Sequence, residues 1–303
     1  MSGTAAPGPD VDEDASHAGD VPPLVVRGRG GGLAEALGRR YLLSLLVRKE
    51  LRVRYRASVL GLGWSYVKPA VQFGVYFVAL GLVLRQREIG DYAVYLFGGL
   101  AVVSTFSEAV GNGTRSVVTN ADLVRKIYLP RELFPLSSVC VAAVHLAPQL
   151  VVLALGALAC GWRPDAVGTA ALLASLVLTG TLALGVGLLL GALNVLFRDL
   201  ENLVDLMLMV LVWLSPVFYS ASRVTDLVGA GSSLEQLYQA NPLTVAVELM
   251  HRATWAQASP GNAALLPGGL LRDTVVAFAV AVSVLVLGQA VFRRLTGRFA
   301  QEL

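Results

Sequence analysis

The chain has 303 residues, of which 55% are hydrophobic and only 15% are charged, and its mean hydropathy is +0.65. A soluble domain averages roughly 45–50% apolar and about 25% charged residues, so this composition excludes an ordinary soluble enzyme or binding domain. The net charge of +3 is small, but the apolar residues gather in long segments. That clustering is typical of a protein that crosses a membrane several times.

The chain begins with a stretch, 1–32, that is rich in Gly, Pro, Ala and acidic residues. Because this composition cannot bury enough apolar surface to fold, we expect a disordered cytoplasmic tail. The next region, 33–66, contains RKELRVRYR, with leucines on one side of a helical wheel and cations on the other. This pattern predicts a basic amphipathic helix lying in the inner interface of the membrane. The alternative is that its cations only set the topology.

The region 67–303 holds the apolar segments, and a membrane-crossing helix needs about 20 such residues. Six segments qualify or nearly do: 67–84, 92–110, 133–158, 168–196, 203–221 and 274–292. With both termini in the cytoplasm, the inside segments hold 18 Lys and Arg residues and the outside segments hold six. This bias satisfies the positive-inside rule. The sequence therefore predicts an all-α, six-span integral membrane protein with both termini cytoplasmic.

The cytoplasmic loop 111–132 contains NADLVRKIYLPRE. Asn120 suits an N-cap, Arg125 and Lys126 suit the end of a helix, and Pro130 stops it. A short, capped helix is more structure than a connection between two spans requires. The loop is either a docking element for a cytoplasmic partner or a compact turn, and these features alone do not separate the two.

The outer segment before the last span, 222–273, is long and contains many apolar residues. Its apolar pieces are too short to cross the membrane and too apolar for a freely solvated loop. They suit short re-entrant helices that dip into the outer leaflet and are shielded by protein.

Aromatic residues gather in two of the predicted spans. The residues are Tyr66, Phe73, Tyr76 and Phe77 in the first span, and Trp213, Phe218 and Tyr219 in the fifth. Interfacial belts and helix packing explain such residues. A ring-lined path for sugars is the sharper alternative, because sugar C–H faces stack on aromatic rings.

Few ionisable residues lie within the spans, and such residues are candidates for function. Glu108 lies at the end of the second span, His145 in the third and Asp205 near the start of the fifth. One histidine and one edge aspartate do not form a proton relay, so we expect His145 to be a packing residue. The small-xxx-small pair Gly187 and Gly191 in the fourth span predicts close helix packing.

The chain contains no GxxxxGK[ST] motif, no cluster of zinc ligands and no GxSxG motif. We therefore predict no catalytic residues, no metal site and no cofactor in this chain. If it moves a substrate uphill, the energy must come from a partner.

Five motifs in order give the chain a resemblance to a known family. They are RYRASVLGLGWSYVKP at 54–69, N-x-x-L-x-x-K-x-x-x-P-R-E at 120–132, FRD at 197–199, SPVFY at 215–219 and NPLTVAVELMHR at 241–252. Over roughly 40–300 the chain resembles the membrane (permease) subunit of polysaccharide-exporting ATP-binding-cassette transporters, which include O-antigen, teichoic-acid and galactan exporters.

The resemblance implies a homodimeric permease of the bacterial cytoplasmic membrane that binds two copies of a separate ATPase, which holds the ATP and Mg. The substrate would be an undecaprenyl-diphosphate-linked polysaccharide used in cell wall biogenesis. The abundance of Arg over Lys indicates a GC-rich genome and is compatible with a galactan.

The resemblance also assigns roles to residues. It implies ATPase docking by Asn120, Leu123, Arg125, Lys126, Pro130, Arg131 and Glu132, an outer gate with Asn241, Pro242 and Arg252, and a glycan channel lined by the seven aromatic residues above. Arg48, Arg52, Arg54 and Arg56 lie where a lipid diphosphate would approach from the inner leaflet, and arginine forks suit diphosphate oxygens.

Other classes of function share part of this pattern. A type-two exporter of a drug or lipid has the same six spans and the same ATPase dependence. A membrane-embedded glycosyl- or acyltransferase would need an acid, base or nucleophile constellation, and the loops offer none.

Overall fold

The structure is a computed structural model that describes residues 32–56, 58–59, 61–83, 89–126, 129–229, 231–259 and 261–302. Within these ranges all regular structure is helical. The predicted tail, 1–32, lies outside the described residues except for Gly32.

The longer elements are α2 (Arg40–Arg54), α3 (Trp64–Tyr76), α4 (Tyr92–Thr119), α6 (Leu133–Ala159), α7 (Ala166–Leu196), α8 (Leu200–Leu214), α11 (Pro242–Ala253) and α12 (Leu270–Thr296). The shorter ones are α1 (Gly32–Gly38), η1 (Gly61–Gly63), η2 (Phe77–Val83), α5 (Ala121–Lys126), α9 (Ala221–Val228), α10 (Ser233–Gln239), η3 (Asn262–Leu265) and α13 (Phe299–Glu302).

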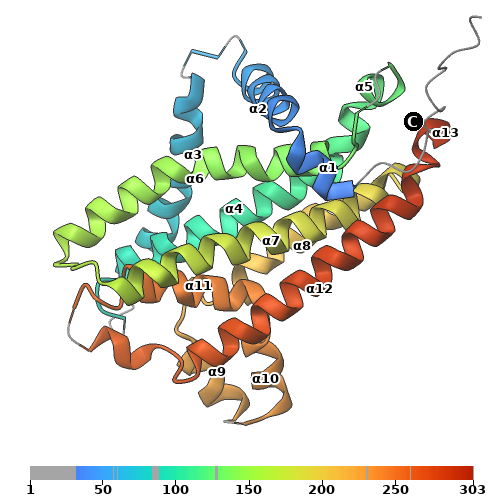
Figure 1. Ribbon diagram of the computed structural model, residues 1–303. Coiled ribbons are helices and arrows are strands. Elements are labelled where there is room, and N and C mark those ends of the chain that lie inside the picture. Colours follow the sequence, from blue (N-terminus) through green and yellow to red (C-terminus); the bar gives the residue numbers. More distant parts are fainter. Residues whose placement is uncertain are drawn as a thin grey trace, which may run out of the picture.

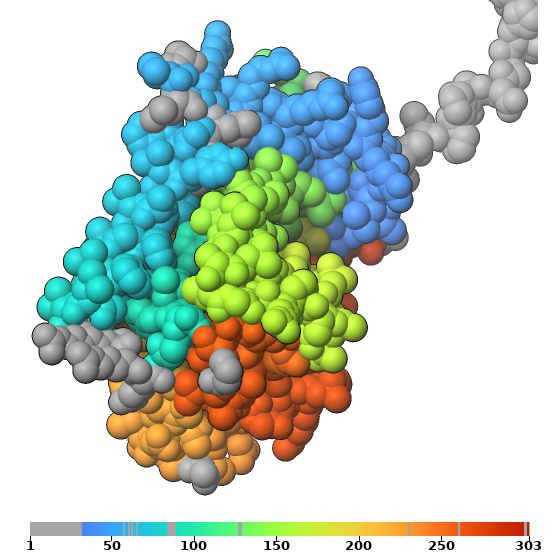
Figure 2. Space-filling view, turned by 90° about the vertical axis from the view of Figure 1, so that its left-hand side faces the viewer, coloured from blue at the N-terminus to red at the C-terminus, as the bar shows by residue number. Residues whose placement is uncertain are grey.

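The helices form a tilted bundle with different elements at its two ends (Figure 1). α1, α2, α5 and the C-terminal α13 lie at one end, and α9 and α10 lie at the other. The space-filling view agrees, with the blue segment of α1 and α2 and the orange region of α9 and α10 at opposite ends (Figure 2). The first described residue and the C-terminus therefore lie at the same end of the bundle.

Five helical stretches are long and apolar enough to cross a membrane: Tyr66–Val83, Tyr92–Thr119, Leu133–Ala159, Ala166–Leu196 and Leu270–Thr296. Each overlaps a predicted span. The second span was expected to end at 110, but α4 continues to Thr119. Glu108 does not end this helix, because its side chain is bonded to groups of α2 and α6. The loop predicted to begin at 111 therefore begins at Asn120.

The predicted fifth span, 203–221, coincides with α8, a helix of 15 residues. At 1.5 Å per residue α8 reaches roughly 22 Å, less than the ~30 Å of a bilayer core. The helix ends because Pro216 disfavours helical backbone at Ser215, which is extended with ψ 152°. The SPVFY segment then continues as irregular backbone with Val217 and Phe218 buried. A sixth crossing stays a prediction.

The central helix is α4, in which 67% of the residues of the most apolar stretch are buried. Glycines let it approach α7 closely, as the small-xxx-small pattern predicted. A Cβ on Gly113 would lie 3.2 Å from the Cα of Gly187, and a Cβ on Gly191 would lie 2.9 Å from the backbone oxygen of Gly113. The two backbones are therefore in direct contact, which confirms the expected close packing.

A second glycine contact joins α7 to α12, which run side by side (Figure 1). A Cβ on Gly185 would lie 2.7 Å from the backbone of Leu285, whereas nothing lies within 4 Å of a Cβ on Gly180 of the same helix. Gly185 therefore has no room for a side chain, and Gly180 does.

Gly185→Ala should destabilise the bundle by about 1–3 kcal/mol, because the added methyl forces α7 and α12 apart. The measurement is the Tm of the purified chain in detergent. Gly180→Ala is the matched control, with an expected change between zero and a gain of about 1 kcal/mol from helix propensity. Equal Tm values for the two variants would contradict the contact.

Candidate functional site

A cavity of about 790 Å³ lies among α2, α3, α4, α6 and α8. Its wall mixes charged, polar and aromatic side chains from all five helices. Among them are Arg54, Tyr55, Trp64, Lys68, Gln72, Tyr76, Ser104, Ser107, Glu108, Asn112, Arg115, His145, Gln149, Asp205 and Trp213. In a chain with 15% charged residues this concentration of ionisable groups inside the bundle marks the candidate site.

The polar wall on α4 arises from the spacing of its residues. Ser104, Ser107, Glu108, Asn112 and Arg115 stand at i, i+3, i+4, i+8 and i+11, so they share one helical face. All five line the cavity. The sequence carried this signal, but a span that ended at 110 cut the stripe in two, and Ser104, Ser107, Asn112 and Arg115 were missed.

Glu108 and His145 meet in this wall. The Nδ1 of His145 donates to Glu108 Oε1 over 2.8 Å, and its Nε2 lies 2.9 Å from the Tyr55 hydroxyl. Arg54 donates to the same carboxylate. The expectation that His145 is a packing residue is therefore incomplete: it is 5% exposed, but it links α2, α4 and α6 through polar contacts.

A second charged group lies further along α4. Arg115 donates to Asp205 of α8, and its Nε lies 3.7 Å from Glu201 Oε2. The pair of Arg115 and Asp205 joins α4 to α8, and its two residues are ninety positions apart in the sequence. Asp205, singled out as an isolated ionisable residue, therefore has an arginine partner.

The predicted aromatic residues divide into two groups. Tyr76 and Trp213 line the cavity with ring centroids 6.2 Å apart. Phe218 packs on both rings, at 4.7 and 4.6 Å. Trp64, which sequence reasoning passed over, also lines the cavity.

The other predicted aromatic residues do not line it. Phe73 stacks on Phe77 at 5.6 Å and meets Phe97 edge-on, Tyr66 is 46% exposed, and the Tyr219 hydroxyl donates to the backbone oxygen of Trp213. These residues pack helices together or face outward.

The amphipathic helix corresponds to α2, which buries Leu46 against the bundle. Arg48, Arg52 and Arg56 are exposed and do not line the cavity. Arg54 does, because it lies at the C-terminal end of α2, where the helix meets α4. Of the four residues predicted to bind the lipid diphosphate, Arg54 lines the cavity and the other three do not.

The predicted docking residues differ in their exposure. Arg125 and Lys126 of α5 are exposed at the end of the bundle, and Leu123 is half-buried. Asn120, Pro130 and Glu132 are buried, which leaves little of them for a partner to touch. Residues 127–128 lie outside the described ranges.

The buried residues of this segment hold it to the bundle. The Glu132 carboxylate accepts from Gln289 of α12 over 3.3 Å. Arg131 donates to the backbone oxygen of Thr296 and lies 5.6 Å from the centroid of the Phe299 ring. These contacts fix the start of α6 against α12 and α13.

Asn120 was expected to cap α5 with its side chain, but that side chain is used elsewhere. Its Nδ2 donates to the backbone oxygen of Ser116, and its Oδ1 accepts from Lys49 of α2 over 2.5 Å. Next to Lys49, Glu50 accepts from the Ser137 hydroxyl over 2.9 Å, and burial raises the pKa of Glu50. α2 is therefore bonded to the docking segment as well as to the cavity.

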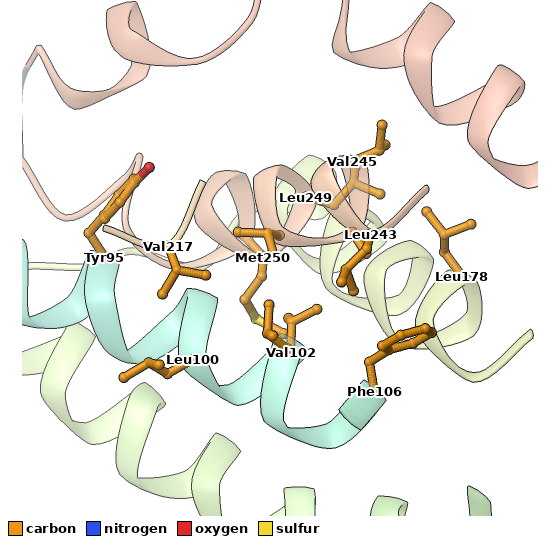
Figure 3. Packing of buried hydrophobic residues seen from close by; sticks show 14 of the residues in the cluster. Tyr95, Leu100, Val102, Phe106, Leu178, Val217, Leu243, Val245, Leu249 and Met250 are labelled. Carbon is orange, nitrogen blue, oxygen red and sulfur yellow. The ribbon is translucent and has the colours of Figure 1, made fainter. Parts of the chain in front are cut away.

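In the outer segment, α11 is buried among α4, α7 and α12, as Figure 3 shows for Met250 against Val102. Asn241 caps the helix by accepting from the backbone N–H of Leu243 over 3.0 Å, and Pro242 occupies its first turn. Arg252 lies 3.7 Å from Asp165, in the connection between α6 and α7. The three predicted gate residues thus fix α11 in place.

The SPVFY and NPLTVAVELMHR motifs meet on one tyrosine. The Tyr95 hydroxyl lies 2.7 Å from the backbone oxygen of Tyr219, and the Tyr95 ring stacks on His251 of α11 at 3.8 Å. His251 Nε2 in turn donates to the Tyr95 backbone oxygen over 3.1 Å. Tyr95 therefore joins two motifs that sequence reasoning treated separately.

A single carboxylate closes the α9–α10 hairpin. Glu235 accepts from the Thr225 hydroxyl at 2.6 Å and from the backbone N–H of Gly231 at 2.5 Å. These two hydrogen bonds lower the pKa of Glu235 from its ordinary 4.5.

Loss of the bond between α2 and the docking segment should loosen both. In Lys49→Met we expect amide exchange at the C-terminal half of α2 and in α5 to be about fivefold faster, the effect of about 1 kcal/mol. The measurement is hydrogen exchange by mass spectrometry. Arg48→Met, next to it and exposed, is the control and should leave exchange unchanged. Similar exchange in both variants would refute the link.

The hairpin should open in acid. Because the hydrogen bonds lower the pKa of Glu235, they stabilise the hairpin above pH 4.5, and this stabilisation is lost as the pH falls through the lowered pKa. Exchange of the α9 and α10 amides should therefore accelerate below pH 4.5, after correction for the intrinsic rate. In Glu235→Gln this acid-dependent step should disappear, and its persistence would assign the step to another group.

Comparison with known proteins identifies the family. The ABC-2 type transporter family matches residues 41–254. An O-antigen export system permease protein RfbA from Klebsiella pneumoniae is 26% identical over 268 residues, covering 87% of this chain and 96% of the relative. One from Myxococcus xanthus is 33% identical over 188 residues, covering 62% of this chain and 71% of the relative. The chain belongs to the ABC-2 type transporter family, as a multi-pass membrane permease that works with an ATP-binding-cassette ATPase and not as an enzyme.

Proposed function

We propose that the chain is the permease subunit of an ATP-driven exporter that moves an undecaprenyl-diphosphate-linked polysaccharide across the bacterial cytoplasmic membrane. The observation that carries the proposal is the cavity itself. Its wall holds cations suited to phosphate oxygens together with the Tyr76 and Trp213 rings, suited to sugar faces. A transporter of a simple lipid would not need both kinds of surface in one cavity.

The relatives support the class of substrate. Both proteins described above are named as O-antigen export permeases, and the Klebsiella relative is covered over 96% of its length. A polymer of the O-antigen, teichoic-acid or galactan type, carried as a lipid-linked oligosaccharide and used in cell wall biogenesis, fits this chain.

The working assembly in this proposal is a homodimer with two ATPase subunits, which bind the ATP and Mg. A second copy would cover apolar side chains that the single chain exposes, such as Leu206, Met207 and Val210 on α8. Both termini lie in the cytoplasm, in keeping with the cation bias and with the position of α1 and α13 at one end of the bundle.

The docking surface for the ATPase is the exposed tip of α5. Arg125 and Lys126 face outward at the same end of the bundle as the C-terminus. The buried Asn120, Pro130 and Glu132 and the half-buried Arg131 lie on either side of the tip. The exposed Arg48, Arg52 and Arg56 attract anionic headgroups to the inner surface.

Reversing the charge of the tip should release the ATPase. In Arg125→Glu with Lys126→Glu we expect the amount of co-purified ATPase to fall about tenfold, because like charges replace complementary ones at the contact. The measurement is the stoichiometry of the complex after mild purification of the tagged chain. Arg163→Glu, an exposed arginine between α6 and α7, is the control.

Two results would contradict this proposal. A wild-type chain that purifies without any ATPase would remove the power source of the exporter. An ATPase that stays with the double variant as firmly as with Arg163→Glu would place the docking surface elsewhere.

A further inference from the structure

Three cations line the cavity from three different helices: Arg54 from α2, Lys68 from α3 and Arg115 from α4. Arg48, Lys49 and Arg52 of α2 do not line it. Cations inside a membrane-spanning bundle are costly, and they are retained where they bind a partner or a substrate.

The two arginines already have carboxylate partners. Arg54 donates to Glu108, and Arg115 donates to Asp205. Both arginine side chains remain 36% exposed, and the carboxylates are 25% and 54% exposed. A guanidinium has five N–H donors in a planar fork, so each arginine keeps donors that its carboxylate partner does not use, although Arg115 also donates to the backbone oxygen of Gly111 over 3.3 Å.

Lys68 differs from the arginines, since it forms no ion pair with any described residue. The cavity wall thus holds three cations and two carboxylates, Glu108 and Asp205. In the empty cavity Glu108 and Asp205 occupy N–H donors of the two arginines, so an incoming anion competes with them for these donors.

The charges and the rings are arranged in the same order on two helices. On α3, Lys68 precedes Tyr76 by eight residues, and on α8, Asp205 precedes Trp213 by eight residues. Eight residues correspond to roughly 12 Å along a helix. All four side chains line the cavity, so the Tyr76 and Trp213 rings lie about the length of a disaccharide from Lys68 and Asp205. Trp64, four residues before Lys68, adds a ring at the charged end.

We propose that Arg54, Lys68 and Arg115 form a binding site for a phosphate-bearing anion, and that Glu108 and Asp205 are counter-ions which the incoming phosphates replace. This inference rests on the proposed function, since the anion is then the diphosphate that joins the lipid to the glycan. The two carboxylates keep the arginines paired while the cavity is empty, and they compete with the bound substrate, which favours its release.

If phosphates replace the carboxylates, neutralising a carboxylate and neutralising a cation should change the affinity for lipid diphosphate in opposite directions. The permease–ATPase complex is placed in phosphatidylcholine nanodiscs, and binding of labelled undecaprenyl diphosphate is measured. Glu108→Gln with Asp205→Asn should lower the Kd about fivefold, and Arg115→Gln or Lys68→Gln should raise it about fivefold, as expected for partly exposed charged groups. Arg40→Gln, at the far end of α2, is the matched control and should bind as the wild type does.

Different results would contradict the counter-ion exchange and the proposed export function. If the wild type binds and the carboxylate variant binds more weakly, the carboxylates only position the arginines, and the exchange is refuted. Unchanged binding in Arg115→Gln and Lys68→Gln would remove the site from the cavity. A wild type that binds no lipid diphosphate contradicts the proposed function itself. If the double variant fails to assemble, Asp205→Asn alone, at the more exposed carboxylate, should also lower the Kd, by a smaller factor.

Free pyrophosphate tests the source of the anion. Added to the same nanodiscs, inorganic pyrophosphate should compete only weakly, because it lacks the lipid that holds the headgroup at the membrane surface. Competition at the Kd of the lipid, with the same dependence on Arg115, would show a site for free phosphate compounds and overturn the assignment to a lipid headgroup.

Discussion

The close approach of α4 to its neighbours is the constraint on which the rest of the structure depends. Gly113 meets Gly187 and Gly191 backbone to backbone, so one face of α4 is closed against α7 without intervening side chains. Because that face is occupied, the polar stripe from Ser104 to Arg115 must point toward α3, α6 and α8. The cavity therefore follows from helix packing, and its chemistry follows from which face of α4 the glycines leave free.

Helix α2 connects the two regions that a transporter has to coordinate. Through Lys49 it is bonded to Asn120 beside the exposed tip of α5, and through Arg54 and Tyr55 it is bonded to Glu108 and His145 in the cavity wall. The distance along α2 between Lys49 and Arg54 is only five residues, roughly 8 Å. The start of α5 and the wall of the cavity are therefore joined through one short helix.

Sequence reasoning identified the helical membrane class, the positions of most spans and the family. The sequence-based predictions failed where a polar side chain can bond either to its own helix end or to a distant residue. Asn120 has the chemistry of an N-cap, but its side chain bonds Lys49 and the backbone of Ser116. Glu108 resembles a residue that ends a span, but its partners come from α2 and α6. In both cases the side chain is bonded to α2, because a polar residue in a helix or at its end is tolerated when a distant residue satisfies it.

The sequence by itself determined the membrane class, the cation bias and the helix-packing glycines, because these depend on composition and on spacing within one helix. Only the tertiary structure decided which of four arginines faces the cavity, which of seven aromatic residues lines it, and that Arg115 pairs with Asp205. Those choices depend on how each helix is rotated about its axis and on which distant helix it meets. Spacing along the chain leaves the rotation free, and packing against neighbouring backbones fixes it.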